Sequence, residues 1–240
     1  MHQSQHDFQK TTLQVYSHRN EKLKRKWAYT LLFVSTGLFI LSALGVLNGL
    51  SEYIQQSLEG SLGFTNKWSE TFGPSWFVHL MSDVAALGGK VIIFFATSIT
   101  IGYYWIRHEH KKLWKFVIVV IGGGTLLIGL KLAYAQDVPY EPVDLFISSI
   151  ANFPSGHAMM SMIFYLTIAV FLTRKQRRTV VRKYTLIVAS LIVILVGLAR
   201  LFGAQHSLSE VIAGWSAGLA WLCLCWFADR YFKIHYSWDF

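Results

Sequence analysis

Charged residues are scarce in this chain of 240 residues. Only 15% of the residues are Asp, Glu, Lys or Arg, whereas 53% are hydrophobic, and the mean hydropathy is +0.40. A soluble domain of this length rarely has so little charge and so many apolar residues. The composition therefore argues against a soluble globular protein and favours an integral membrane protein.

Cysteine is nearly absent as well, and the sequence shows no internal repeat and no low-complexity linker. The two cysteines, Cys223 and Cys225, lie one residue apart in an apolar run. Residues at this spacing point to different sides of a helix and cannot form an ordinary disulfide there. We interpret them as core or lipid-facing residues of a single integral domain.

Apolar runs take up most of the chain. A helix that spans a bilayer needs about 20 predominantly apolar residues, and six stretches reach or approach that length. The first is not a cleavable signal peptide, because it is too long, starts late and lacks a small-residue cleavage pattern. We therefore predict an all-α integral membrane protein with six transmembrane helices, at about residues 27–50, 87–106, 116–135, 158–173, 184–199 and 211–228.

Lysine and arginine are sorted along the chain. Of the 22 basic residues, 18 fall in residues 1–26, 107–115, 174–183 and 230–233, which are alternate connections of a six-helix chain. The positive-inside rule places these four segments and both termini in the cytoplasm. Because topology explains the charge, the high pI is weak evidence for nucleic-acid binding, and we expect no nucleic-acid partner.

The predicted organisation is a polar cytoplasmic tail (1–26), a membrane domain (27–230) and a cytoplasmic end (231–240). Residues 51–80 form a long connection on the non-cytoplasmic side that is rich in aromatic residues. Such a segment is typical of an interfacial helix or lid, and an aromatic belt explains it about as well. Gly122, Gly123 and Gly124, inside the third run, indicate close helix contact rather than a phosphate-binding loop.

Several polar residues gather at span ends on the non-cytoplasmic side. An ionisable group inside a span costs about 2.5–3.5 kcal/mol at the bilayer centre and less near an end. One such residue can extend its side chain to the interface, but convergence at one depth and one side predicts a site. The residues concerned end the third and fifth spans or begin the fourth and sixth: Lys131, Ser155, Gly156, His157, Arg200, His206 and Glu210.

The residue types favour phosphate chemistry. Lys131 and Arg200 can bind a phosphate as counter-ions. Ser155 and the amides around Gly156 lie at a helix start, where backbone N–H groups and the helix dipole favour an anion. One histidine can attack phosphorus while the other protonates the leaving oxygen.

A carboxylate lies within reach of one of these histidines. Glu210 follows His206 by four residues, on the same helical face, and can fix the imidazole tautomer. A simple i,i+4 helix pair is the alternative interpretation of His206 and Glu210, and helix capping is the alternative for His157. The combination with Arg200 and Ser155 favours catalysis for both histidines.

Three sequence motifs resemble those of the type-2 phosphatidate phosphatase superfamily, which includes the vanadium haloperoxidases. The first is Lys131, six residues, then Val138-Pro139. The second is Pro154-Ser155-Gly156-His157, and the third is Ala199-Arg200, five residues, His206, three residues and Glu210. The spacing is kept in all three motifs, so the combination is far more specific than any one of them.

The resemblance implies a role for each matching residue within a six-helix bundle of this fold. His206 would be the nucleophile, Glu210 its orienting carboxylate and His157 the general acid. Phosphate would be bound by Lys131, Ser155, Gly156 and Arg200. No metal and no cofactor are implied, and Asp137, Glu141 and Asp144 fit a solvated loop better than a metal site.

Three positions depart from the family motifs. Val138 stands where the family has arginine, Ala199 where it has serine, and Glu210 where it has aspartate. Losing a charge-assisted contact to the transition state can lower the rate by about 10²–10³. Lys90, near the non-cytoplasmic end of the second span, could replace the missing charge, although a lysine that reaches for the interface is the simpler interpretation.

The expected function is hydrolysis of a lipid phosphate or of an isoprenoid or glycerolipid (di)phosphate, through a phosphohistidine intermediate. The substrate's tail would lie in the bilayer, and the site would face the non-cytoplasmic side of a bacterial inner membrane. The alternative is a catalytically impaired member that binds phospholipid or a membrane partner, which the three departures favour. A transporter or channel lacks support, because no charge lies mid-membrane and no inverted repeat is evident.

Overall fold

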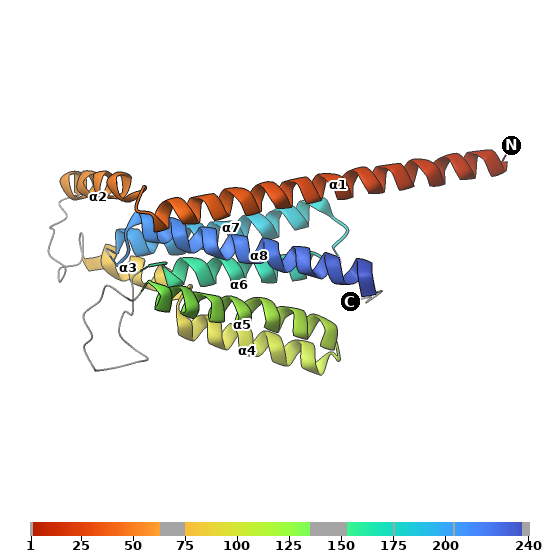
Figure 1. Cartoon of the computed structure of the whole chain (residues 1–240). Coiled ribbons are helices and arrows are strands. Elements are labelled where there is room, and N and C mark those ends of the chain that lie inside the picture. The colour runs from red at the N-terminus through yellow and green to blue at the C-terminus, as the bar shows by residue number, and fades with distance from the viewer. Residues whose placement is uncertain (1, 63–74, 135–152, 175, 204, 237–240) are drawn as a thin grey trace.

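A computed structural model describes the backbone of residues 2–62, 75–134, 153–174, 176–203 and 205–236 (Figure 1). Within these ranges the chain is helical and contains no strand. The helices are α1 (His2–Ala43), α2 (Asn48–Leu62), α3 (Ser75–Ala86), α4 (Lys90–Ile106), α5 (His110–Ala133), α6 (Gly156–Thr173), α7 (Thr179–Phe202) and α8 (Leu208–Tyr236).

Six helical segments of the described chain are long and apolar enough to cross a membrane. They are Glu21–Ala43, Trp76–Ile106, His110–Ala133, Gly156–Thr173, Thr179–Phe202 and Leu208–Phe232. The prediction of an all-α protein with six spans is thus confirmed. The division into tail, membrane domain and cytoplasmic end stays a prediction.

The first span ends earlier than the apolar run predicted. The run continues to residue 50, but α1 ends at Ala43 and the chain turns before α2. Gly45 has a positive φ of 73°, and the amides of Gly45 and Val46 donate to the carbonyls of Ser42 and Leu41 at 3.1 and 3.0 Å. This pattern is a Schellman motif, in which a glycine closes a helix and satisfies its last carbonyls.

The second span is longer than predicted and is broken near one end. It starts at Trp76, within the segment interpreted as an interfacial connection, and the break at residues 87–89 separates α3 from α4. At the break, the hydroxyl of Tyr165 in α6 donates to the carbonyl of Leu87 at 2.9 Å. A carbonyl that the helix cannot satisfy is thereby paired inside the protein, as membrane depth requires.

Helix α6 lies at the centre of the bundle, against α7 and α8, and α1 runs along α8 (Figure 1). Glycines of α8 allow the close approach to α6. A Cβ on Gly214 would lie 2.5 Å from the carbonyl oxygen of Ser155, and one on Gly218 would lie 3.0 Å from that of Met159. Small residues four apart are typical of tightly packed membrane helices.

The glycines of α5 also permit helix contact, which confirms that interpretation of the triplet. A Cβ on Gly123 would lie 3.2 Å from the indole nitrogen of Trp221 in α8 and 3.3 Å from Cγ2 of Ile163 in α6. The same indole nitrogen donates to the carbonyl of Val119 at 2.8 Å. Helices α5, α6 and α8 therefore meet around these residues.

Because Gly214 packs on backbone, its replacement by alanine should destabilise the protein. The added methyl cannot displace a backbone carbonyl without moving the start of α6, and overpacking of this kind usually costs about 1–3 kcal/mol. We expect a lower thermal midpoint in detergent for Gly214→Ala. Gly102→Ala is the control, since a Cβ there meets nothing within 4 Å; equal midpoints would contradict the packing argument.

The other end of the bundle is held by ion pairs. Asp229 of α8 pairs with Lys115 of α5 and, at 3.3 Å, with Arg174 after α6. Glu21 of α1 pairs with Arg230 of α8 and, at 3.0 Å, with Lys24. The candidate site described next lies at the opposite end, where α2 and α3 are found (Figure 1).

Candidate active site

Four helix ends meet at one end of the bundle, and each carries residues expected in the site (Figure 1). Lys131 lies in the last turn of α5 and Arg200 in the last turn of α7. Ser155 is the N-cap of α6, and His157 lies in its first turn. His206 precedes α8, and Glu210 is in the first turn of that helix.

His206 is oriented by a carboxylate. Its Nδ1 lies 2.8 Å from Oε2 of Glu210, and the imidazole side chain is only 8% exposed. The amide of His206 donates to the carbonyl of Arg200 at 3.2 Å, which ties the histidine to the end of α7. With Nδ1 engaged by Glu210, Nε2 is the nitrogen left to act on a ligand.

Glu210 also caps the helix on which it lies. Its Oε2 accepts the amide of Ser207 at 3.1 Å, and the hydroxyl of Ser207 accepts the amide of Glu210 at 3.3 Å. This reciprocal pair is a capping box, which the pattern Ser207-x-x-Glu210 would have predicted from the sequence. The carboxylate is thus fixed by the helix start before it orients the imidazole.

The start of α6 is joined to the same turn. The amide of Ser155 donates to the carbonyl of Glu210 at 3.0 Å, so motifs 55 residues apart in sequence meet through the backbone. Ser155 is fully buried, yet its Oγ has no hydrogen-bond partner among the described residues, and neither has the buried Nε of Arg200. Unpaired buried polar atoms are costly, and their clustering in one place is typical of a site for a polar ligand.

Lys131 lies beside the start of α6, at Gly156. A Cβ on Gly156 would lie 3.7 Å from Cε of Lys131 and 3.3 Å from Cδ2 of Leu127. Backbone N–H groups at a helix start together with a lysine favour an anion.

His157 lies within the electrostatic influence of the other groups. Arg200, His206, Lys90 and Lys131 are the ionisable residues around it. The structure therefore brings the seven predicted residues to one end of the bundle, with cations in excess of the single carboxylate of Glu210. Their roles in catalysis stay predictions.

Two contacts of the site were not predicted from the sequence. Ser51, buried in α2, accepts the amide of Leu208 at 3.1 Å, so α2 is bound to the first residue of α8. No sequence signal predicts this contact, because it joins residues 157 apart. Gly88, in the break of the second span, packs against His157, and the adjacent glycines Gly88-Gly89 were the available signal.

The described residues contain no group of three His, Cys, Asp or Glu side chains that could hold a metal ion. Val138, Asp137, Glu141 and Asp144 lie outside the described residues. The interpretation of the three acidic residues as a solvated loop therefore stays a prediction.

The family model of the PAP2 superfamily matches residues 112–233, a range that includes every residue of the candidate site. The chain belongs to the PAP2 superfamily. The resemblance to type-2 phosphatidate phosphatases, predicted from three motifs, is thereby confirmed.

This PAP2 chain is similar in sequence and in fold to phosphatidylglycerophosphatase from Bacillus subtilis. Phosphatidylglycerophosphatase B of strain 168 is 28% identical over 146 residues, which are 60% of this chain and 71% of that protein. The crystal structure of a transmembrane PAP2 type phosphatidylglycerolphosphate phosphatase matches with a TM-score of 0.66 at 20% identity, covering 87% of this chain and 98% of that one. The structural match supports the fold.

Proposed function

We propose that this PAP2 protein is a membrane phosphatase that hydrolyses a lipid phosphate through a phosphohistidine intermediate. One observation carries the proposal: a carboxylate-oriented imidazole lies at the same helix ends as two buried polar atoms, Ser155 Oγ and Arg200 Nε, that have no partner among the described residues. A tetrahedral phosphate would give both atoms a partner.

In the first step, Nε2 of His206 attacks phosphorus and a P–N bond forms. The bond between phosphorus and the lipid oxygen breaks, and that oxygen takes its proton from His157. Glu210 stabilises the imidazolium that develops on His206. Lys131, Arg200 and the first amides of α6 bind the phosphoryl oxygens, whose charge is spread in the transition state.

In the second step, water attacks the phosphorus of phosphohistidine while His157 takes a proton from that water. The P–N bond breaks, inorganic phosphate leaves and His206 is restored. The two steps together consume one water and leave both histidines as they began. His157 thus acts first as a general acid and then as a general base.

The position of the site supports a lipid substrate. It is formed by the ends of four spans, so a lipid can keep its tail in the bilayer while its phosphate reaches the helix ends. The Bacillus subtilis relatives name phosphatidylglycerol phosphate as the first candidate, and phosphatidate and isoprenoid diphosphates are the next. Phosphate release by purified protein, measured on all three with His206→Ala beside it, tests the proposal.

A second function has a specific basis. Val138, Ala199 and Glu210 depart from the family motifs, and Ala199 is buried at the end of α7 without the hydroxyl of the family's serine. A catalytically impaired member would bind phospholipid or a membrane partner without turnover. Retained binding of a lipid phosphate with no phosphate release from any of the three would favour this second function.

Activity should not need a divalent metal. Two cations, a helix start and two imidazoles supply the charge neutralisation and the proton transfer that a metal otherwise provides. We expect phosphate release at an unchanged rate in excess EDTA. A rate abolished by EDTA and restored by magnesium would show that an ion takes part in the reaction.

We infer a location in a bacterial inner membrane, with both termini in the cytoplasm and the site on the other face. The basis is the sorting of Lys and Arg to one side, together with a bacterial relative. Single cysteines placed at positions 176 and 67 should be labelled by a membrane-impermeant reagent from opposite sides. Labelling of both from the same side would overturn this orientation.

A further inference from the structure

A lysine lies at the break of the second span, beside the candidate site. Lys90 is the first residue of α4. Two residues earlier, Gly88 is buried against α6: a Cβ there would lie 3.0 Å from the carbonyl oxygen of His157 and 3.4 Å from its Cβ. The break therefore places Lys90 close to the first turn of α6.

Contacts with α6, and not membrane depth alone, fix the position of this break. The hydroxyl of Tyr165 donates to the carbonyl of Leu87 at 2.9 Å, and Gly88 packs against His157. A lysine that only reaches for the interface needs no such fixed start of its helix.

We propose that Lys90 is a third cation for the phosphate of the substrate, acting with Lys131 and Arg200. This inference rests on the proposed function, since it needs a phosphate in the site. An anion of charge near −2 is then opposed by three cations, with Glu210 engaged by His206 and Ser207. Lys90 touches the headgroup of the ligand and leaves the covalent steps to the two histidines.

The test compares Lys90→Gln and Lys90→Arg with Arg107→Gln, at the opposite end of the same helix. Loss of one charge-assisted contact should lower kcat/KM by about 10- to 100-fold in Lys90→Gln. Inhibition by inorganic phosphate should weaken in the same variant. Lys90→Arg keeps the charge and should retain most activity, and Arg107→Gln should resemble the parent in both measurements.

The outcomes separate this inference from the proposed function. If His206→Ala is inactive while Lys90→Gln keeps the parental kcat/KM and phosphate inhibition, the proposed role of Lys90 is wrong. The proposed phosphatase function is then unaffected. Turnover that survives in His206→Ala overturns the proposed function instead. Equal losses in Lys90→Gln and Arg107→Gln, or a lower thermal midpoint in the former alone, would assign the effect to helix stability.

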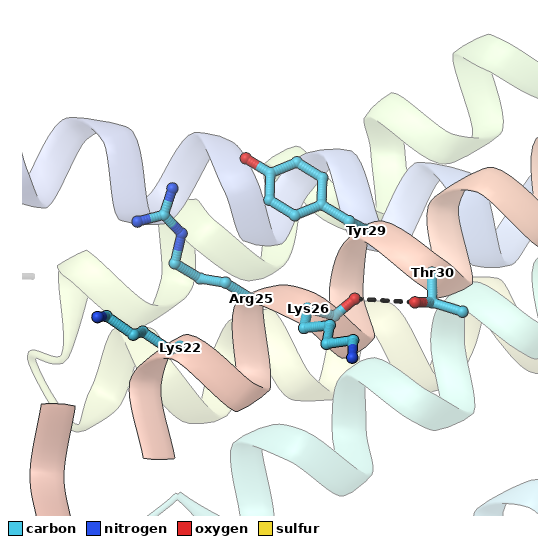
Figure 2. Close-up of a pocket in the computed structure, with 5 residues that line it drawn as sticks. All are labelled: Lys22, Arg25, Lys26, Tyr29 and Thr30. Carbon is cyan, nitrogen blue, oxygen red and sulfur yellow. Dashed lines mark hydrogen bonds between the residues drawn. The ribbon is translucent and has the colours of Figure 1, made fainter. Parts of the chain in front are cut away.

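A separate observation concerns the opposite end of the bundle, where α1 lines an open cavity of about 420 Å³. Figure 2 shows its lining residues on successive turns of α1: Lys22, Arg25, Lys26, Tyr29 and Thr30. The spacing of three and four residues places them on one helix face. Three cations with a tyrosine around one cavity suit a phosphate group.

The acid nearest to these cations is already paired. Glu21 pairs with Lys24 and with Arg230 of α8. Within the described part of the chain, Lys22, Arg25 and Lys26 have no side-chain hydrogen bond and no ion pair, and Tyr29 is held against Phe227 with ring centroids 4.5 Å apart. The open cavity thus combines three unpaired cations with a tyrosine that packs against α8.

We propose that this cavity binds the headgroup phosphate of an anionic phospholipid in the leaflet opposite the active site. A lipid is chosen over a free anion because exposed apolar residues follow at once along α1, among them Trp27 at 60% and Phe33 at 81% exposure. The headgroup can therefore occupy the cavity while its acyl chains lie along the helix. Basic pockets at this depth are known to bind anionic headgroups.

The experiment measures lipid retained by purified protein after exposure to phosphatidylserine or phosphatidylcholine vesicles. Phosphatidylserine is neither substrate nor product of the proposed reaction. The triple variant Lys22→Gln, Arg25→Gln, Lys26→Gln should retain several-fold less phosphatidylserine than the parent. The control Arg178→Gln, Arg182→Gln, Lys183→Gln removes the same charge from exposed positions at the start of α7 and should retain the parental amount.

Three results would overturn this second proposal. Equal losses of retained phosphatidylserine in the two triple variants would indicate binding to a general basic surface. No loss in either variant would show that the cavity does not bind this lipid. A thermal stabilisation by inorganic phosphate that matches the one by phosphatidylserine vesicles, and that is lost in the triple variant of α1, would assign the cavity to a free anion. Retained phosphatidylcholine should be the same in all three proteins.

Discussion

Replacing His206 with alanine should reduce phosphate release by about 10⁴-fold or more. The imidazole is the group oriented by Glu210 and tied by its amide to Arg200. Without it no P–N bond can form, and water has no activated route to the phosphorus. The measurement is the initial rate of phosphate release from the lipid phosphate that the parent hydrolyses best.

The matched control is His108→Ala, because His108 is exposed and lies between α4 and α5, at the end of the bundle away from the site. It should keep the parental rate. The covalent intermediate gives a second measurement: rapid quenching should trap acid-labile phosphate on the parent and none on His206→Ala. A variant that keeps more than about 10% of the parental rate would reject His206 as nucleophile.

The sequence predicts the six spans because two simple quantities, hydropathy and the sorting of basic residues, decide them. It predicts the site because three spaced motifs fall at span ends on one side. Neither quantity reports the turn at Gly45, which interrupts an apolar run, or shows that residues 76–86 before the break belong to the second span. These features depend on backbone hydrogen bonds and on packing against α6 and α8.

The contact between the motif of His157 and the motif of His206 also could not be predicted from the sequence. It depends on the amide of Ser155 donating to the carbonyl of Glu210, and on Gly214 allowing α8 to approach that turn. By contrast, the capping box at Ser207 and Glu210 can be predicted from the four-residue pattern Ser-x-x-Glu. It gives a physical reason for glutamate where the family has aspartate, because glutamate is the acid preferred at the third position of such a box.

Two variants should separate the two tasks of Glu210. Glu210→Gln keeps an amide oxygen that can accept the amide of Ser207, so the helix start survives. The neutral side chain cannot stabilise the imidazolium on His206, and its amide nitrogen can pair with the wrong tautomer. We expect phosphate release to fall by about 10²–10⁴-fold, with a thermal midpoint close to that of the parent.

Ser207→Ala should show the opposite pattern. It removes the hydroxyl that accepts the amide of Glu210 at 3.3 Å but leaves the carboxylate 2.8 Å from His206. Loss of an N-cap costs about 1 kcal/mol, which lowers the thermal midpoint by about 2–4 °C in a chain of this size, and the rate should fall by less than about 10-fold. If Glu210→Gln instead kept the full rate and lost stability, the carboxylate would be a helix cap alone, and the orientation of His206 would have to come from the carbonyl of Arg200 and the packing around it.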